Sequence, residues 1–254
     1  MTRLNRFSRR LGERIRAFPP RVDRAASASE AVVLLHGLGR TRRSLFVLER
    51  VLRRAGYFVV NRTYPSKNHE IDALADIAVG GGVAAARAHA PVTRIHFATH
   101  SMGGILLRAW FAERSIEGFG RAVMLAPPNR GTELVDQMSE LGVAEWMLGP
   151  AGAALGTGQE DAPQRLPDLA LPYGVIAGAT SMNPATSAIL NGEDDGKVSV
   201  ASTMLPGAVD HLTLPVTHTL MMNEPMTIWQ CARFLRRGAF DHEARLNRLP
   251  STRA

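Results

Sequence analysis

The chain has 254 residues, of which 45% are hydrophobic, a composition that excludes an intrinsically disordered protein and is typical of one globular domain with a large core. The apolar runs fall short of the roughly 20 residues that a transmembrane helix needs, and a single cysteine, Cys231, excludes an intrachain disulfide. Eight arginines against Glu13 and Asp23 give residues 1–24 a charge of +6 out of a total of +7, so the other 230 residues carry only +1 and nucleic acid is not an expected partner.

An amphipathic pattern marks residues 1–24, with arginines on the faces not occupied by Leu4, Phe7, Leu11, Ile15 and Phe18. One interpretation is a basic helix on an anionic membrane surface or a partner, and the other is a solvated, partly frayed terminus. No hydrophobic stretch follows Ser8-Arg9-Arg10, and residues 17–30 have the composition of a linker, so we expect no cleaved signal peptide. The expected location is cytoplasmic, with peripheral membrane contact under the first interpretation.

From residue 31 onward, apolar runs alternate with helical patterns. The run at 31–35 is continuously apolar, as in a strand that is covered on both faces of a parallel sheet. Strands that alternate with helices imply right-handed crossovers, so we predict an α/β domain over 31–238 with a mostly parallel sheet and helices on both faces. Strands are predicted at 31–35, 57–61, 95–99, 122–125, 173–177 and 208–214.

Helices are predicted from a Thr41 cap to Gly56, over 68–89, over 105–111, and from an Asn223 cap to Arg237. In the first, Leu45, Leu48 and Leu52 fall on one face. In the second, the glycine run 80–82 predicts a break or a close packing contact. Gly238 is the expected stop of the last helix, in which Cys231 is interpreted as a small buried hydrophobe, and 239–254 is expected to be a polar tail.

The segment 126–172 is rich in glycine and proline and is too long for an ordinary connection, so we predict an irregular region. Its larger apolar residues are Leu134, Met138, Trp146, Met147 and Leu148. One interpretation is a small cap that roofs the site and contacts an apolar part of a substrate. The other is an excursion that packs on the core for structural reasons alone.

A sharp turn is predicted at 99–103, Thr-His-Ser-Met-Gly, between an apolar strand and a helix. The pattern is close to G-x-S-x-G, in which a strained turn lifts a serine hydroxyl above the end of a sheet. Gly103 fits this pattern, whereas Thr99 replaces the leading glycine with a compact but branched residue. Ser101 is therefore the candidate nucleophile, against the alternative that the turn only joins strand to helix.

A serine nucleophile needs a base, and the base needs a third group that holds its tautomer and balances its charge. Three acids lie in the turn 191–200, NGEDDGKVSV, before a short strand-like segment. We select Asp195 because aspartate before glycine suits a tight turn. Asp194 is the second choice, and a solvated acidic loop that includes Glu193 is the structural alternative.

His218 is the predicted base because it follows the strand at 208–214 and precedes the last helix. His211 competes with it but lies within that strand, where a packed or partly exposed histidine is expected. His100 is expected to point along the start of the next helix, and His96 to lie inside its strand. Three further histidines in polar surroundings are interpreted as surface residues: His69, His89 and His242.

The oxyanion of a tetrahedral intermediate needs N–H donors that are already in place. We predict the backbone N–H of Met102, which follows Ser101 at a helix N-terminus, and that of Leu38 in the turn His36-Gly37-Leu38-Gly39. The structural alternative is a glycine-rich turn with no further role. This turn does not match G-x-G-x-x-G, so a dinucleotide site is not expected.

The segments VVLLHGLGR, HFATHSMGG, EDDGKVSV and LPVTHTLMM together resemble the bacterial lipase and esterase branch of the α/β-hydrolase superfamily, including lipase-like proteins related to PGAP1-type acyl hydrolases. The resemblance covers about 31–238, and 126–131, APPNRG, is similar to the loop after the following strand in such lipases. It implies an α/β-hydrolase fold, a triad of Ser101, Asp195 and His218, and oxyanion donors at Leu38 and Met102.

The residues and the resemblance predict a serine hydrolase that cleaves carboxylic esters through an acyl-enzyme, without a metal or an organic cofactor. The expected partner is a small ester or lipid, and the apolar residues around the site favour an acyl chain over a charged substrate. An acyltransferase or a thioesterase with the same triad is one alternative. A non-catalytic binding or membrane-associated protein on a hydrolase scaffold is the alternative of another class.

Overall fold

The computed structural model describes residues 29–89 and 92–244. The amphipathic segment within 1–24, its predicted membrane contact and most of the linker lie outside the described residues. None of the helices within the described ranges is long and apolar enough to cross a membrane.

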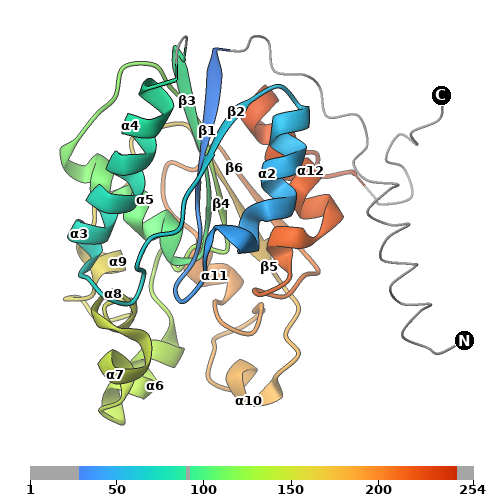
Figure 1. The fold of residues 1–254 in the computed structure, drawn as a ribbon. Helices are drawn as coiled ribbons and strands as arrows, with labels where there is room; N and C mark the ends of the chain where they lie inside the picture. The colour runs from blue at the N-terminus through green and yellow to red at the C-terminus, as the bar shows by residue number, and fades with distance from the viewer. Residues whose placement is uncertain (1–28, 90–91, 245–254) are drawn as a thin grey trace, which may run out of the picture.

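Six parallel strands form one sheet in the order β2-β1-β3-β4-β5-β6 (Figure 1). They are β1 (Glu30–Leu35), β2 (Phe58–Asn61), β3 (Arg94–His100), β4 (Phe119–Leu125), β5 (Tyr173–Gly178) and β6 (Asp210–Leu214). Each predicted strand is confirmed, with ends that move by up to three residues. Because the strands are parallel, their carboxyl ends share one edge, which is the lower edge in Figure 1.

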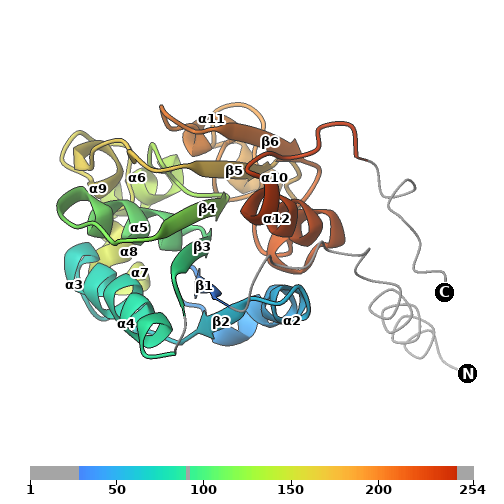
Figure 2. The same ribbon diagram turned by 90° about the horizontal axis from the view of Figure 1, so that it is seen from above.

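Helices cover both faces of the sheet, as Figure 2 shows from above. One face carries α2 (Phe46–Arg54) and α12 (Pro225–Arg237), and the other carries α3 (Ile71–Ala75), α4 (Gly81–Arg87) and α5 (Met102–Glu113). Side chains alternate along β1, so Val32 and Leu34 pack toward the first layer and Val33 and Leu35 toward the second. The predicted α/β architecture is confirmed.

The first predicted helix begins as a 3₁₀ turn, η1 (Arg42–Leu45), before α2. Leu48 and Leu52 are fully buried on its inner face, as predicted. Thr41 precedes the turn, but its side chain makes no capping hydrogen bond. Its carbonyl oxygen instead accepts the N–H of Ser44 at 3.0 Å.

The glycine run 80–82 lies where the second helical region changes geometry. A π-helical turn, η2 (Asp76–Gly80), precedes α4. A β-carbon on Gly82 would lie 2.5 Å from Val33 Cγ1, so the helix approaches β1 too closely for a larger residue. The predicted close contact is present, but the helix is not broken, because Gly80 and Gly81 keep helical φ and ψ and the π turn continues directly into α4.

The last helix is capped by Glu224 and not by Asn223. The Glu224 carboxylate accepts the N–H of Thr227 at 2.7 Å, whereas Asn223 ends a 3₁₀ turn, η3 (Met221–Asn223). The prediction of Asn223 was wrong because Pro225 occupies the first position of the helix and keeps the residue before it, Glu224, in extended backbone, so the cap falls at Glu224.

Gly238, with a φ of 79°, ends α12 as predicted. Cys231 is buried in this helix, also as predicted, and burial raises the pKa of its thiol to about 12. The polar tail does not start at residue 239, because Phe240 is buried against Phe234 of α12.

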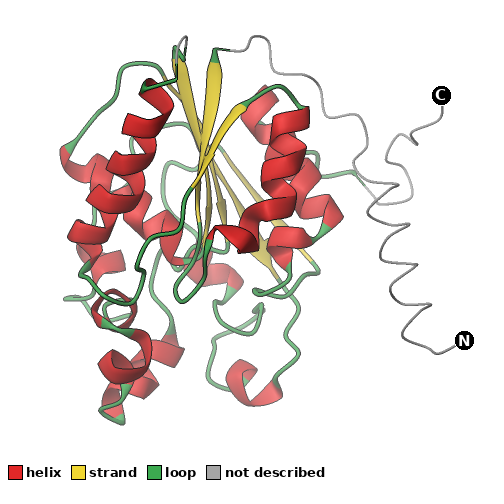
Figure 3. Cartoon of the chain, in the orientation of Figure 1, coloured by secondary structure: helices red, strands yellow, loops and turns green. Residues whose placement is uncertain are grey.

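Most of 126–172 is irregular, as predicted, but it also contains four short helices that were not predicted. They are α6 (Glu133–Glu140), α7 (Ala144–Leu148), α8 (Pro150–Ala153) and α9 (Ala162–Arg165). Two of them carry a proline in the first turn, where the missing N–H has no intrahelical role. Figure 3 shows the helices with the loops that join them.

Arg108 of α5 fastens this segment to the domain. Its guanidinium is buried and donates hydrogen bonds to the carbonyl oxygens of Asn129, Pro163 and Leu166 at 2.8–3.0 Å.

Further along the chain, α10 (Pro184–Ser187) precedes the acidic turn. The strand-like segment predicted after that turn is instead the helix α11 (Val200–Thr203).

His96 lies inside β3, as predicted, where the register against β4 is irregular. Its Nδ1 accepts the N–H of Arg121 at 3.0 Å, and its Nε2 lies 3.5 Å from Glu30 Oε2. Burial, followed by the charges of Arg121 and Arg94, lowers the pKa of His96 to about 3. The imidazole is therefore neutral in the folded protein across the mildly acidic range.

We predict that His96 makes the fold sensitive to acid. Its reference pKa of 6.5 exceeds the folded value of about 3, so unfolding takes up a proton and stability falls as the pH drops between these values. The change His96→Gln should reduce the slope of unfolding free energy against pH by up to about 1.4 kcal/mol per pH unit. Urea unfolding between about pH 6 and pH 4 measures it, and a slope no different from that of the exposed-site control His69→Gln would contradict the prediction.

Candidate active site

Ser101 stands at the apex of the turn between β3 and α5, with φ 53° and ψ −128°. Two backbone hydrogen bonds hold the turn: Ser101 N–H donates to Leu125 O at 2.8 Å, and Gly104 N–H donates to Ser101 O at 2.9 Å. A residue with a β-carbon rarely adopts a positive φ, and such strain concentrates at functional sites. The residue is half-buried.

The small residues of the turn have distinct roles. A β-carbon on Gly103 would lie 2.6 Å from the carbonyl oxygen of Leu35, so α5 reaches its position only with glycine there. Thr99, which replaces the leading glycine of the motif, is fully buried at the end of β3. Its branched side chain is thus accommodated by the core, and the turn forms without that glycine.

Asp195 is buried and both oxygens of its carboxylate are engaged. Oδ1 accepts the N–H groups of Lys197 at 3.0 Å and Val198 at 2.9 Å. Oδ2 lies 2.8 Å from His218 Nδ1. Two backbone donors therefore fix the orientation in which this carboxylate meets the imidazole.

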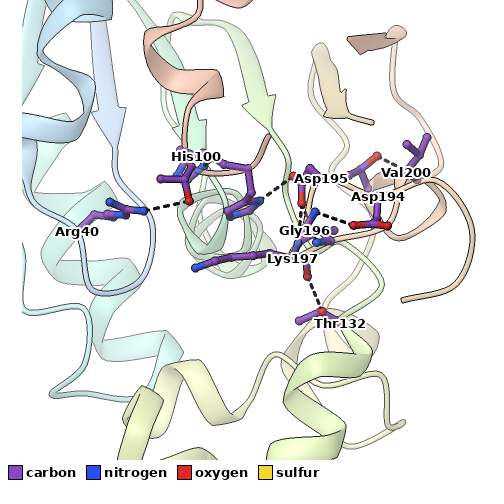
Figure 4. Close-up of polar contacts among 12 residues, drawn as sticks. Arg40, His100, Thr132, Asp194, Asp195, Gly196, Lys197 and Val200 are labelled. Carbon is purple, nitrogen blue, oxygen red and sulfur yellow. Dashed lines mark hydrogen bonds and ion pairs between the residues drawn. The ribbon is translucent and has the colours of Figure 1, made fainter. Parts of the chain in front are cut away.

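The other two acids of the turn do not contact His218. Asp194 Oδ1 accepts the N–H of Gly196 at 2.7 Å and the hydroxyl of Ser187 at 3.1 Å, so Asp194 folds the loop (Figure 4). Glu193 is exposed, and its carbonyl oxygen accepts the N–H of Val200 at 2.7 Å.

His218 is held by Asp195 at two points. The imidazole Nδ1–H donates to the carboxylate, and the backbone N–H of His218 donates to the carbonyl oxygen of Asp195 at 2.9 Å. With the proton on Nδ1, Nε2 carries the lone pair of a base.

His211 lies elsewhere: it is half-buried, with Nε2 2.9 Å from Thr203 Oγ1. The three histidines expected at the surface are exposed: His69, His89 and His242.

His100 contacts the site in a way that the sequence did not indicate. Its Nε2–H donates to the carbonyl oxygen of His218 at 3.0 Å, and the two rings lie 4.7 Å apart. Burial, and then the charge of His218, hold the pKa of His100 well below its ordinary value, so it stays neutral. The expected direction along the helix was wrong. The available signal was strand alternation, which points His100 to the opposite face from Thr99.

The turn after β1 lies directly against Ser101. A β-carbon on Gly37 would lie 3.0 Å from Ser101 Cβ, and the Gly39 N–H is fixed by Ser66 Oγ at 2.9 Å. The ring of His36 is buried and stacks on Tyr64 at 3.9 Å, which anchors the start of the turn. Leu38 lies between these glycines, and Met102 is the first residue of α5.

Ser101 is linked to the acid and base pair through its chain neighbour His100. Within the described ranges no hydrogen bond joins Ser101 Oγ to His218. Catalytic hydrogen bonds are often long before substrate binds and tighten in the complex. The described part of the chain also contains no cluster of three or more His, Cys, Asp or Glu side chains arranged to hold a metal ion.

Solved structures of lipases and esterases share this architecture. A Bacillus licheniformis lipase, BlEst2 in its mature form, matches with a TM-score of 0.64 and 20% identity over 81% of this chain and 91% of its own. The phospholipase PlaB from Legionella pneumophila matches with 0.59 and 17% identity over 83% and 60%. The metagenomic carboxyl esterase MGS0156 matches with 0.58 and 16% identity over 87% and 76%. The chain has the α/β-hydrolase fold. No family model and no curated protein sequence matches it.

We predict that Gly103→Ala lowers the free energy of unfolding by roughly 2–4 kcal/mol, because the new methyl group would collide with backbone that cannot move aside. Gly81→Ala is the matched control: its β-carbon would lie 3.6 Å from the nearest atom in a helix of ordinary φ. That control should be neutral or stabilising by up to about 1 kcal/mol. Thermal and urea unfolding measure both, and similar stabilities would contradict the close approach of α5 to β1.

Proposed function

We propose that the protein is a serine hydrolase that cleaves carboxylic esters through an acyl-enzyme. The observation that carries the proposal is the 2.8 Å hydrogen bond between His218 and Asp195, placed beside a serine in a strained turn. A serine hydroxyl is a weak nucleophile and requires a base that is held by an acid, and His218 and Asp195 are buried together at the same edge of the sheet. The likeness of the fold to lipases and esterases supports an ester-hydrolase function.

In the proposed reaction, His218 Nε2 takes the proton of Ser101 Oγ as the oxygen attacks the ester carbonyl carbon. Asp195 stabilises the imidazolium that forms. The N–H groups of Leu38 and Met102 receive the oxyanion, and His218 returns the proton to the departing alcohol oxygen. Water then adds to the acyl-enzyme by the same route, which releases the carboxylic acid and restores the serine.

The segment 126–172 is proposed to be a cap. It contacts both loops that flank the site: a β-carbon on Gly152 of α8 would lie 2.7 Å from Leu38 Cδ2, and Thr132 before α6 donates to the carbonyl oxygen of Lys197 at 2.7 Å. Trp146 of α7 is 87% exposed and so is not committed to the core. An apolar surface beside the catalytic edge suits the acyl chain of an ester.

Two narrower predictions extend the proposal. The kinship with PGAP1-type hydrolases remains a prediction from sequence, because none of the structures named above is of that type. Peripheral membrane contact through residues 1–24 also remains a prediction, and it predicts that deletion of these residues weakens binding to anionic liposomes.

We predict that Ser101→Ala abolishes measurable hydrolysis of 4-nitrophenyl esters and labelling by a fluorophosphonate probe. The loss should reach about a thousandfold or more, because no other hydroxyl takes the place of the nucleophile. The control is Ser115→Ala, which changes an exposed serine beyond the opposite end of α5 from Ser101. Hydrolysis or labelling of Ser101→Ala at the wild-type rate would overturn the proposal.

We predict that Asp195→Asn lowers kcat by about 10³–10⁴ with a small effect on KM, as expected when the base loses its tautomer. Asp194→Asn keeps a side-chain oxygen for Gly196 and should retain kcat within about tenfold while lowering stability. Steady-state kinetics and thermal unfolding of both proteins separate the two roles. A larger loss of kcat in Asp194→Asn than in Asp195→Asn would show that Asp194, and not Asp195, is the acid that orients His218.

A further inference from the structure

Two cations reach the proposed catalytic site from opposite sides. Arg40 follows the turn after β1, and Lys197 lies in the acidic turn 191–200, two residues after Asp195. In Figure 4 the charged ends of Arg40 and Lys197 approach the same region from the left and the right, and His100 lies above this region in the view. Neither residue belongs to the proposed triad or oxyanion donors.

Both cations are tied to the backbone of catalytic loops. The Arg40 N–H donates to Gly37 O at 3.2 Å, and its Nη2 donates weakly to the hydroxyl of Thr219, next to His218, at 3.4 Å. The N–H of Lys197 donates to Asp195 Oδ1. Each charged side chain therefore belongs to a loop that also carries a residue of the proposed catalytic site.

No carboxylate of the described residues forms an ion pair with either cation. Among the described residues, neither Arg40 nor Lys197 has a carboxylate oxygen within 4.0 Å of its charged nitrogens. Asp195 is the nearby acid, and both of its oxygens are used by His218 and by backbone N–H groups.

The charges of Arg40 and Lys197 interact with each other and with His100. Desolvation, and then Arg40, lower the pKa of the Lys197 ammonium, whereas the charge of Asp195 raises it, and both cations add to the lowering of the pKa of His100. Counting Arg40, Lys197 and Asp195, the formal charge of these three side chains is +1. A bound anion would relieve this repulsion, and a neutral ester would not.

We propose that the site takes esters that carry an anionic phosphate or carboxylate group, which Arg40 and Lys197 bind while Ser101 attacks the ester carbonyl. This inference rests on the proposed function. It also revises the expectation of an uncharged substrate: the apolar cap residues still suit an acyl chain, and the anionic group lies on the side of the two cations. A guanidinium and an ammonium are the side chains best suited to such oxyanions.

The test compares two soluble esters that differ only in a phosphate, hexanoylglycerol and hexanoylglycerol 3-phosphate, each below its micellar concentration. We expect kcat/KM to be at least tenfold higher for the phosphate ester at low salt, and the preference to shrink as ionic strength rises. Arg40→Gln and Lys197→Gln should each lower the ratio of the two kcat/KM values by about tenfold, the usual effect of losing a hydrogen bond to a charged group. The exposed Arg43→Gln is the control, with an unchanged ratio.

A ratio near one in the wild type, or a ratio that neither variant changes, would overturn the anion site while leaving ester hydrolysis intact. Calorimetric binding of the same two esters to Ser101→Ala protein tests the site without catalysis. We expect tighter binding of the phosphate ester and its loss with Lys197→Gln added. Equal binding of the two esters overturns the inference whether or not the wild type is an esterase.

Vesicles distinguish the source of the anionic group. Faster acid release from phosphatidylglycerol than from diacylglycerol, each dispersed in the same vesicles of a non-hydrolysable ether lipid, with the difference removed by Arg40→Gln, indicates that a lipid headgroup supplies it. Preference for the soluble phosphate ester alone indicates a water-soluble substrate. Both results support the anion site, and a preference for diacylglycerol contradicts it.

Discussion

The hydrogen bond between His218 Nδ1 and Asp195 Oδ2 is the interaction on which the account of the site depends. The two residues come from different loops, and a second bond between their backbones supports the first. Asp195 is in turn held by two N–H donors of its own loop. Because both side chains are buried, the carboxylate and the imidazole meet in a setting where their interaction is strong and their geometry fixed.

The parallel sheet makes this meeting a consequence of topology. β3, β5 and β6 end at one edge, so the turn that bears Ser101 and the loops that bear Asp195 and His218 leave the sheet on the same side. The close approach at Gly103 then sets α5 against the end of β1. A strained serine, a glycine without room for a side chain and a buried hydrogen bond between an imidazole and a carboxylate are compatible with folding because two helical layers pack the rest of the sheet.

Sequence patterns predicted the architecture well because long apolar runs encode it. The run at 31–35 is buried on both faces, and the order of strands and helices follows from such runs. Short helices escaped prediction: those between residues 133 and 165 have four to eight residues, too few to display a helical period. The cap of α12 was misplaced by one residue because Glu224 and Asn223 are both suited to accept an orphan N–H.

For the candidate site, the sequence indicated residue types and order but not contacts. Asp195 was preferred to Asp194 for its place before glycine, and it is Asp195 that meets His218. The role of His100 depends on a carbonyl more than a hundred residues away, which no local pattern encodes. Tertiary structure likewise brings Arg40 and Lys197 to face each other. In the sequence alone, each is indistinguishable from a solvated surface charge.

The most direct test of the central claim is the ¹⁵N spectrum of the His218 imidazole near neutral pH, assigned by comparison with a His218→Gln protein. We predict a single tautomer with the proton on Nδ1 and the lone pair on Nε2, and loss of that preference in Asp195→Asn protein. An imidazole protonated on Nε2, or one whose spectrum is the same with and without the Asp195 carboxylate, would contradict the account.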